Sequence, residues 1–155
     1  MNFSITDYKH IFLRIVCVLI FTTPTFTTAQ ELKPFTTDGC SVFPDGNIKQ
    51  HNLWLKCCIQ HDLKYWKGGT FSEKLDADNQ LEACVRGVGE PEIATIMLAG
   101  VRIGGSPYLP TPYRWGYGWP YPRGYKALSQ TEKHKVQQSI EEFKNMLETL
   151  SSDLN

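Results

Sequence analysis

The feature that most constrains the fold is a pair of adjacent cysteines, Cys57 and Cys58, in a chain of 155 residues with 5 cysteines. Neighbouring cysteines rarely reach the geometry of a disulfide with each other, so each of them needs a distant partner. Small exported domains are often held together by such disulfides. The sequence therefore favours a small disulfide-linked domain in which the segment around this pair is fixed on two sides.

The N-terminus accounts for the odd number of cysteines. A basic start, a short apolar core at residues 15–21 and a small-residue end at Ala29 form the pattern of a secretory signal peptide. We therefore expect residues 1–29 to be removed and residues 30–155 to form a secreted or periplasmic domain. Cleavage would take away two of 16 basic residues, one of 16 acidic residues and Cys17, leaving a net charge of −1 and four cysteines: Cys40, Cys57, Cys58 and Cys84.

Composition excludes several classes of protein. A formal net charge of zero argues against a general nucleic-acid binder, which usually has a clear excess of Lys and Arg. A hydrophobic fraction of 41% is sufficient for a packed core and too high for a disordered chain. The length fits one domain. No apolar run reaches the ~20 residues that a membrane-spanning helix needs, so we expect no transmembrane segment after cleavage.

Local signals predict a mostly helical, all-α domain. Thr70-x-x-Glu73 and Ser129-x-x-Glu132 are capping boxes that begin helices, and the glycines from Gly68 onward end the helix before them. No convincing strand pattern or internal repeat is present. The expected helices are 53–66, 70–86, 91–103 and 129–150.

Two segments outside these central helices have a distinct composition. Residues 106–125 are rich in Pro, Gly and aromatic side chains. We favour a long ordered loop whose rings cover the helical core over the alternative, a lipid-binding interfacial surface. The helix at 129–150 is amphipathic, and we expect its apolar stripe to pack in the core. This stripe consists of Val136, Ile140, Phe143, Leu147 and Leu150.

The segment after the cysteine pair concentrates chemically active side chains. On a helix, residues at steps of four share a face, so Cys57, His61 and Tyr65 lie together. Cys58 and Asp62 lie together on the adjacent face, about 100° away. A titratable imidazole and a carboxylate would thus be presented side by side, each anchored near a cysteine.

The remaining cysteines suggest how a second helix lies against the first. Four cysteines allow three pairings, and excluding the adjacent pair leaves two. If Cys57 bonds to Cys84 across an antiparallel helix pair, Asp78 falls close to His61, whereas Asp76 is an exposed neighbour. A carboxylate beside an imidazole fixes its tautomer and stabilises its charged form, which is what a general-base histidine requires.

The motif that these residues form is similar to that of a known protein family. Residues 57–65, Cys-Cys-Ile-Gln-His-Asp-Leu-Lys-Tyr, resemble the active-site helix of secreted phospholipases A2, which reads Cys-Cys-x-x-His-Asp-x-Cys-Tyr in the animal enzymes. Residues 38–46 resemble a variant of their calcium loop, and Asp78-x5-Cys84 matches their second helix. The resemblance covers residues 38–86. The residues that follow this segment match no subgroup of the family.

The resemblance implies a phospholipase A2-like fold with two antiparallel central helices and the disulfides Cys40–Cys58 and Cys57–Cys84. The chain departs from the family at two places. The family's cysteines are missing at Lys64 and Ala77, which the antiparallel register places opposite each other. Glycines of the animal calcium loop are replaced at the positions of Ser41 and Phe43.

By resemblance, the chain would be a secreted, calcium-dependent phospholipase A2 acting on phospholipid at a membrane or micelle surface. Water activated by a histidine would attack the sn-2 ester, and calcium and a loop N–H would stabilise the oxyanion. The implied catalytic residues are His61, Asp78 and Tyr65. The implied calcium ligands are Asp62, the carbonyls of Gly39, Ser41 and Phe43, and a carboxylate from Asp38 or Asp45, with the Ser41 N–H as the oxyanion donor.

Two other functions remain open from the sequence. The unusual calcium loop favours a catalytically silent, lipid-binding or toxin-like module, whereas retention of His61, Asp62 and Asp78 favours the enzyme. A structural metal or redox site at Cys57, Cys58 and His61 is less favoured, because adjacent cysteines lack the Cys-x2–4-Cys spacing typical of zinc sites.

Overall fold

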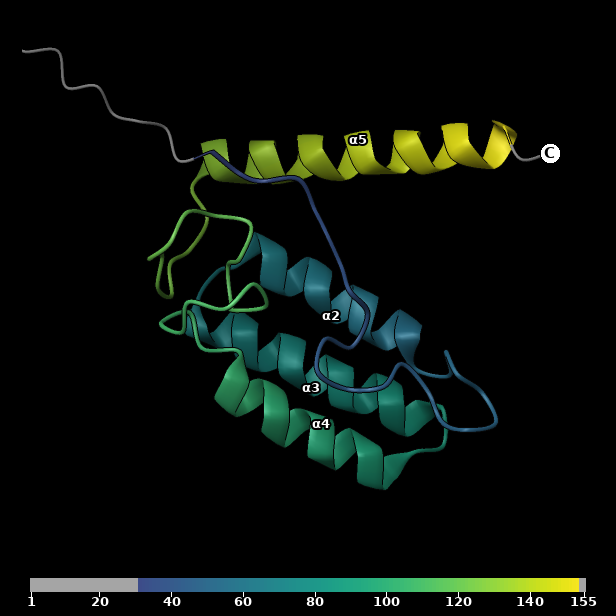
Figure 1. Ribbon diagram of the computed structural model, residues 1–155. Coiled ribbons are helices and arrows are strands. Elements are labelled where there is room, and N and C mark those ends of the chain that lie inside the picture. The colour runs from purple at the N-terminus through teal and green to yellow at the C-terminus, as the bar shows by residue number, and fades with distance from the viewer. Residues whose placement is uncertain (1–30, 154–155) are drawn as a thin grey trace, which may run out of the picture.

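The computed structural model describes residues 31–153, so the predicted signal peptide at residues 1–29 lies outside the described residues. The described part contains four helices and no strand, which confirms the expected all-α class (Figure 1). None of these helices is both long and apolar enough to cross a bilayer. The helices are α2 (Leu55–Lys67), α3 (Phe71–Gly87), α4 (Pro91–Gly104) and α5 (Gln130–Asp153).

Both predicted capping boxes are present. The Glu73 N–H donates to Thr70 Oγ1 at 3.2 Å, and the Thr70 N–H donates to Glu73 Oε2 at 2.7 Å. At the start of α5, the Glu132 N–H donates to Ser129 Oγ at 3.2 Å and the Ser129 N–H donates to Glu132 Oε2 at 2.8 Å. Each box pairs backbone donors that the first turn of a helix otherwise leaves unpaired.

The disulfides fix α2 from two directions. Cys57 is bonded to Cys84, with their Cα atoms 5.7 Å apart, which joins the start of α2 to the end of α3. Cys58 is bonded to Cys40, with their Cα atoms 5.0 Å apart, which ties the preceding loop to the same turn of α2. This is the expected pairing, and it leaves neither thiol of the adjacent pair free to bind a metal.

The turn between α2 and α3 makes them antiparallel. Gly68 has a φ of 65°, a left-handed conformation that favours glycine, and its N–H donates to Lys64 O and Tyr65 O. At the two positions where the resemblance implies lost cysteines, Ala77 is buried and Lys64 donates to Gln80, one turn further along α3. A polar contact therefore joins the two helices near these positions.

Helices α2, α3 and α4 pack into one layered body, and α5 lies apart from it, across the chain that precedes α2 (Figure 1). One apolar cluster fills the space between α2, α3 and α4 and includes Trp54, Leu81, Val85, Ala94 and Met97. A second lies under α5 and consists of Phe35, Trp66, Trp119 and Val136, with partly buried side chains around it.

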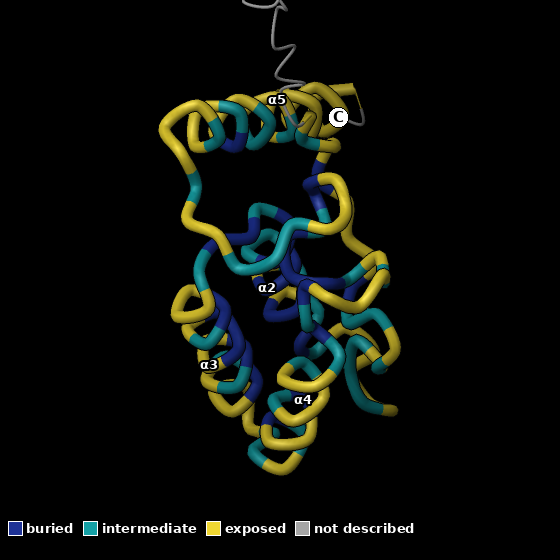
Figure 2. Tube along the Cα trace, turned by 90° about the vertical axis from the view of Figure 1, so that its left-hand side faces the viewer, coloured by how far each residue is buried: buried dark blue, intermediate teal, exposed yellow. Residues whose placement is uncertain are grey.

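Part of the segment 106–125 covers the core, as favoured from the sequence, whereas Tyr108 and Tyr121 are 62% and 51% exposed. Trp115 and Trp119 are fully buried. Their indole N–H groups donate to Gly69 O at 2.9 Å and to Lys67 O at 2.8 Å, which caps the end of α2. This segment lies between α5 and the other helices, and its buried, intermediate and exposed residues alternate along the tube (Figure 2). These two rings are therefore core residues.

The stripe on α5 packs only in part, which corrects the sequence prediction. Val136 is buried, and Ile140 and Phe143 are partly buried against the second cluster. Leu147 and Leu150 were expected in the core, but their exposed fractions are 48% and 52%. Helix periodicity predicts which side of a helix is apolar, and it does not predict how far the rest of the molecule extends beneath it.

Candidate active site

The antiparallel helix pair brings an imidazole and a carboxylate together. His61 on α2 lies with its Nε2 atom 3.3 Å from Oδ1 of Asp78 on α3. His61 is 7% exposed, and Asp78 is fully buried. Burial lowers the pKa of His61, against the raising effect of Asp78, so the imidazole is neutral near pH 7.

The tautomer of His61 follows from its partner. A carboxylate can only accept, so Nε2 carries the proton and Nδ1 carries the lone pair. Within residues 31–153, Nδ1 has no hydrogen-bond partner, and His61 lines a cavity. A neutral imidazole that is held in one orientation, keeps a free lone pair and lines a cavity has the properties of a general base.

Asp78 has four side-chain partners. Its Oδ1 accepts from the Tyr65 hydroxyl at 2.6 Å as well as from His61. Its Oδ2 accepts from Lys74 Nζ at 2.8 Å and lies 3.1 Å from Arg102 Nε. Burial alone would raise the pKa of Asp78, but hydrogen bonds from His61, Lys74 and Tyr65 outweigh this and hold the pKa below its usual value. Asp78 is therefore ionised.

Lys74 and Arg102 contact Asp78 and were not indicated by the sequence. Lys74 is only 2% exposed and also donates to Val101 O at 3.1 Å, so it links α3 to α4 at the Asp78 carboxylate. The spacing of Lys74, four residues before Asp78 on one helix, was the available signal. Arg102 comes from α4, and nothing in its local sequence indicates that it reaches Asp78.

Asp62 lies beside His61 and faces the loop before α2. It is 9% exposed, and its Oδ2 accepts from the Thr37 hydroxyl at 2.7 Å. Burial raises its pKa to about 7, with the Thr37 hydrogen bond opposing and the nearby Asp38 and Asp45 adding to the shift. Several acidic groups held close to a buried carboxylate make this a favourable environment for a cation.

The loop before α2 is held by its own acidic side chain. Gly39 and Ser41 have φ values of 78° and 55°, both in the left-handed region. Asp45 Oδ1 accepts from the Cys40 N–H at 2.8 Å, and a Cβ atom on Gly39 would lie only 2.3 Å from the same oxygen. Asp45 therefore fixes the conformation of the loop. Glycine is required at position 39 because the backbone is left-handed there and a side chain would clash with Asp45.

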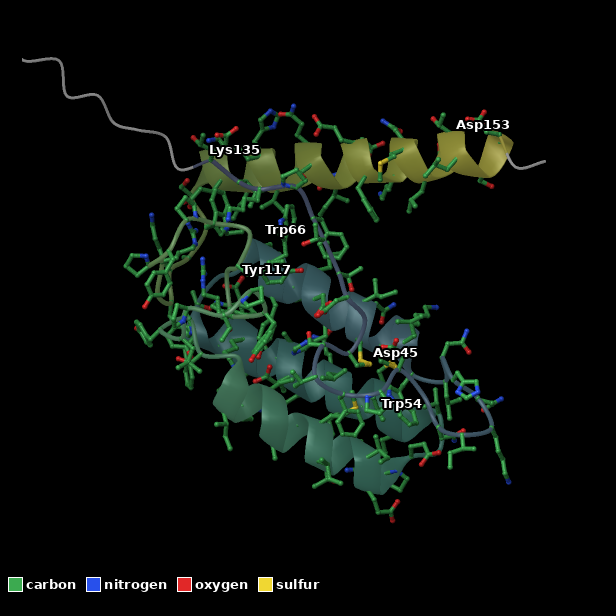
Figure 3. The ribbon with its side chains drawn as sticks, viewed as in Figure 1. Asp45, Trp54, Trp66, Tyr117, Lys135 and Asp153 are labelled. Carbon is green, nitrogen blue, oxygen red and sulfur yellow. A yellow bond between two sulfur atoms is a disulfide. The ribbon has the colours of Figure 1, made fainter. Side chains whose placement is uncertain are left out.

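The backbone carbonyls of this loop divide into two sets. Cys40 O accepts from the Phe43 N–H at 3.1 Å, and Pro44 O accepts from the Trp54 indole at 2.6 Å. Figure 3 shows Asp45 and Trp54 near the disulfides at this end of the molecule. The carbonyls of Gly39, Ser41 and Phe43 accept no hydrogen bond within the described part of the chain.

The oxygen atoms of the loop and of the neighbouring carboxylates suit calcium better than a transition metal. Asp38, Ser41 and Asp62 line a pocket of about 180 Å³, which is completed by Thr36, Thr37, Pro112, Tyr113 and Tyr117. Among residues 31–153 no group of three or more His, Cys, Asp or Glu side chains could hold a metal ion by itself. A site here must combine one or two carboxylates with carbonyls and water, which is the ligand set that calcium prefers.

His61 opens into a second, larger cavity. Its volume is about 240 Å³, and Ser41, Asp62 and Tyr113 border both it and the carboxylate pocket. Its far wall is mainly the apolar side of α4, at Ile96, Met97, Gly100, Val101 and Gly104.

The structure thus gathers most of the predicted residues around one place, whereas Asp45 lines neither cavity and instead accepts from the Cys40 N–H. His61, Asp62 and Tyr65 come from α2, Asp78 from α3, and the carbonyl groups from the loop. Comparisons with models of known families, with curated proteins and with solved structures found no match.

Proposed function

We propose that this chain is a secreted, calcium-dependent phospholipase A2 that hydrolyses the sn-2 ester of glycerophospholipids with a histidine-activated water. One observation carries the proposal. His61 is neutral, is oriented by the ionised Asp78, and lines an apolar cavity that also touches Asp62 and the loop at Ser41. A general base, groups that can hold a cation and space for an acyl chain therefore lie next to one another.

The chain's own residues account for the proton transfers. His61 Nδ1 takes a proton from water as the water oxygen bonds to the acyl carbon. The imidazolium that forms is stabilised by Asp78, whose charge and position are held by Tyr65, Lys74 and Arg102. When the tetrahedral intermediate collapses, the same proton passes to the oxygen of the departing lysophospholipid. No serine or cysteine nucleophile is required.

The loop and Asp62 supply the groups for charge stabilisation. Asp62 and the carbonyls of Gly39, Ser41 and Phe43 would hold the calcium ion, which supplies positive charge to the ester carbonyl when bound. Asp38 is the better placed additional carboxylate, because it lines the pocket with Asp62. The Ser41 N–H donates no described hydrogen bond and is available to an oxyanion.

The surroundings of the cavity suit a lipid substrate at an aggregate surface. Val42 and Ile96 border the cavity and are 89% and 57% exposed. Ile103, two turns further along α4, is 78% exposed. Exposed apolar side chains that gather near an apolar cavity favour docking to lipid over a water-soluble substrate.

The test is fatty-acid release from phosphatidylcholine vesicles. We expect release that depends on calcium and falls by about 10²–10⁴-fold in His61→Ala, because that is the usual contribution of a general base. His51→Ala is the matched control, since His51 is exposed in the turn before α2 and borders neither cavity. Equal activity in both variants would contradict the proposal.

A second candidate is a catalytically silent lipid-binding module. It is favoured by the Thr37 hydroxyl, which already occupies one oxygen of Asp62. One assay, on phosphatidylcholine vesicles, distinguishes the two candidates. Wild-type protein that binds the vesicles and releases no fatty acid, with or without calcium, would support the silent module.

A further inference from the structure

Thr37, in the loop before α2, bonds to both halves of the proposed calcium site. Its hydroxyl donates to Asp62 Oδ2 at 2.7 Å and accepts from the Gly39 N–H at 3.2 Å. Thr37 also borders the pocket that Asp38, Ser41 and Asp62 line. One side chain therefore contacts both the carboxylate and the loop whose carbonyls would hold the ion.

On the carboxylate side, the hydrogen bond from Thr37 selects one orientation of Asp62. The terminal torsion of an aspartate side chain is broad, so the carboxylate turns readily when nothing holds it. Thr37 occupies one position on Oδ2, whereas Oδ1 accepts no hydrogen bond within residues 31–153. A carboxylate has about four acceptor positions on its two oxygens. The hydroxyl therefore orients Asp62 and leaves Oδ1 available to a cation.

On the loop side, Thr37 and Asp45 fix the two peptide planes that flank Gly39. The Gly39 N–H donates to Thr37, and the next N–H, that of Cys40, donates to Asp45 Oδ1 at 2.8 Å. Because a trans peptide is planar, fixing the direction of an N–H also fixes the carbonyl of the same plane. The Cys40 bond thus directs the Gly39 carbonyl away from Asp45, and the Thr37 bond sets the plane before it.

Removing the Thr37 hydroxyl has opposite consequences under two interpretations. If the hydroxyl blocks Asp62, as in the silent module, its loss frees an oxygen and calcium binds more tightly. If the hydroxyl orients Asp62, its loss lets the carboxylate turn and releases the Gly39 N–H, and calcium binds more weakly. The second bond decides between them, because a blocking group has no need to hold the loop as well.

We propose that Thr37 is a positioning residue for calcium, which orients the Asp62 carboxylate and aligns the loop at Gly39 with it. The inference rests on the calcium site of the proposed function and assigns a role in it to a side chain that need not touch the ion. It does not depend on ester hydrolysis, because a silent module that binds calcium would use Thr37 in the same way.

The test is calorimetry of calcium binding to the processed chain and its variants. Thr37→Val keeps the shape of the side chain and removes the hydroxyl. Loss of a group that orients a metal ligand typically weakens metal binding by about 10–100-fold. We expect a rise of about tenfold in the dissociation constant, at the low end, because Thr37 is exposed and water competes for its partners. Thr37→Ser keeps the hydroxyl and should bind calcium as the wild type does.

The matched control is Thr149→Val on α5. It also removes an exposed hydroxyl, which donates to Asn145 O at 2.9 Å, and Thr149 borders neither cavity. Its calcium affinity should equal that of the wild type. Thermal unfolding gives a second readout. Without calcium, Thr37→Val should melt close to the wild type, whereas the increase on adding calcium should be smaller, because stabilisation by a ligand falls as its dissociation constant rises.

The possible results separate this proposal from the proposed function. Unchanged calcium affinity in Thr37→Val, or a serine variant as weak as the valine variant, would overturn the role of Thr37 and leave the proposed function standing. Tighter binding by Thr37→Val would overturn it by showing that the hydroxyl blocks the site. Wild-type protein that binds no calcium at millimolar concentrations would overturn both proposals.

Discussion

At the scale of single residues, the two oxygens of the Asp78 carboxylate have separate tasks. Oδ1 faces His61 and Tyr65, and Oδ2 faces Lys74 and Arg102. A buried charge is costly unless it is paired, so Lys74 and Asp78 depend on each other. The sequence predicted the contact between His61 and Asp78, because helix register determines it. It did not predict a buried lysine, since burial at Lys74 depends on three helices meeting.

Removing the ammonium group of Lys74 should show how far Asp78 depends on it. Lys74→Met leaves Asp78 buried without its closest cation, and we expect a loss of about 3 kcal/mol in the free energy of unfolding, measured with urea. Arg102 is partly exposed, so Arg102→Gln should cost about 1 kcal/mol or less. Equal effects of the two variants would show that the pair with Lys74 is not the dominant one.

At the scale of elements, the parts that were predictable depend on local signals. Capping boxes at Thr70 and Ser129 set the starts of α3 and α5, and glycines after Lys67 end α2. The α2–α3 register followed from adjacent cysteines and a short turn. The packed length of α5 was not predictable, because it depends on where the core beneath the helix ends.

The stability that the capping box contributes at the start of α5 should decrease at acidic pH. Although burial opposes it, hydrogen bonds from Arg123 and from the Ser129 N–H lower the pKa of Glu132 to about 2. The stabilisation is therefore present above about pH 4.5, the unfolded value, and is lost as the pH falls toward 2. We expect Glu132→Gln to cost about 2 kcal/mol at neutral pH and to remove this acid dependence, as thermal unfolding between pH 7 and pH 2 would show. A variant that keeps the wild-type dependence would assign the acid response to another group.

At the scale of the whole molecule, adjacent cysteines join the three parts of the site. Cys40–Cys58 ties the loop to α2, and Cys57–Cys84 ties α2 to α3. The wall of the cavity comes from α4, in the part of the chain that resembled no subgroup. The sequence could predict which side chains meet beside His61 because they lie in a recognisable motif, whereas the shape of the cavity depends on packing between distant segments.

The two disulfides should therefore have separable effects. Replacing either pair by alanine should cost about 3 kcal/mol of stability, because the sequence separations of 18 and 27 residues are similar. Only the Cys40→Ala and Cys58→Ala pair should also weaken calcium binding, since it releases the loop, and calorimetry of calcium binding would measure this. Equal calcium affinity in the two double variants would place the metal away from the loop.

The central claim is that His61 activates water for attack on an sn-2 ester with calcium bound beside it. The most direct measurement is mass spectrometry of the products from phosphatidylcholine vesicles with different acyl chains at sn-1 and sn-2. We predict that the sn-2 fatty acid and the matching lysophospholipid appear in equal amounts, only with calcium, and that both disappear in His61→Ala. Release of the sn-1 chain, or release that continues in a calcium chelator or in His61→Ala, would contradict the claim.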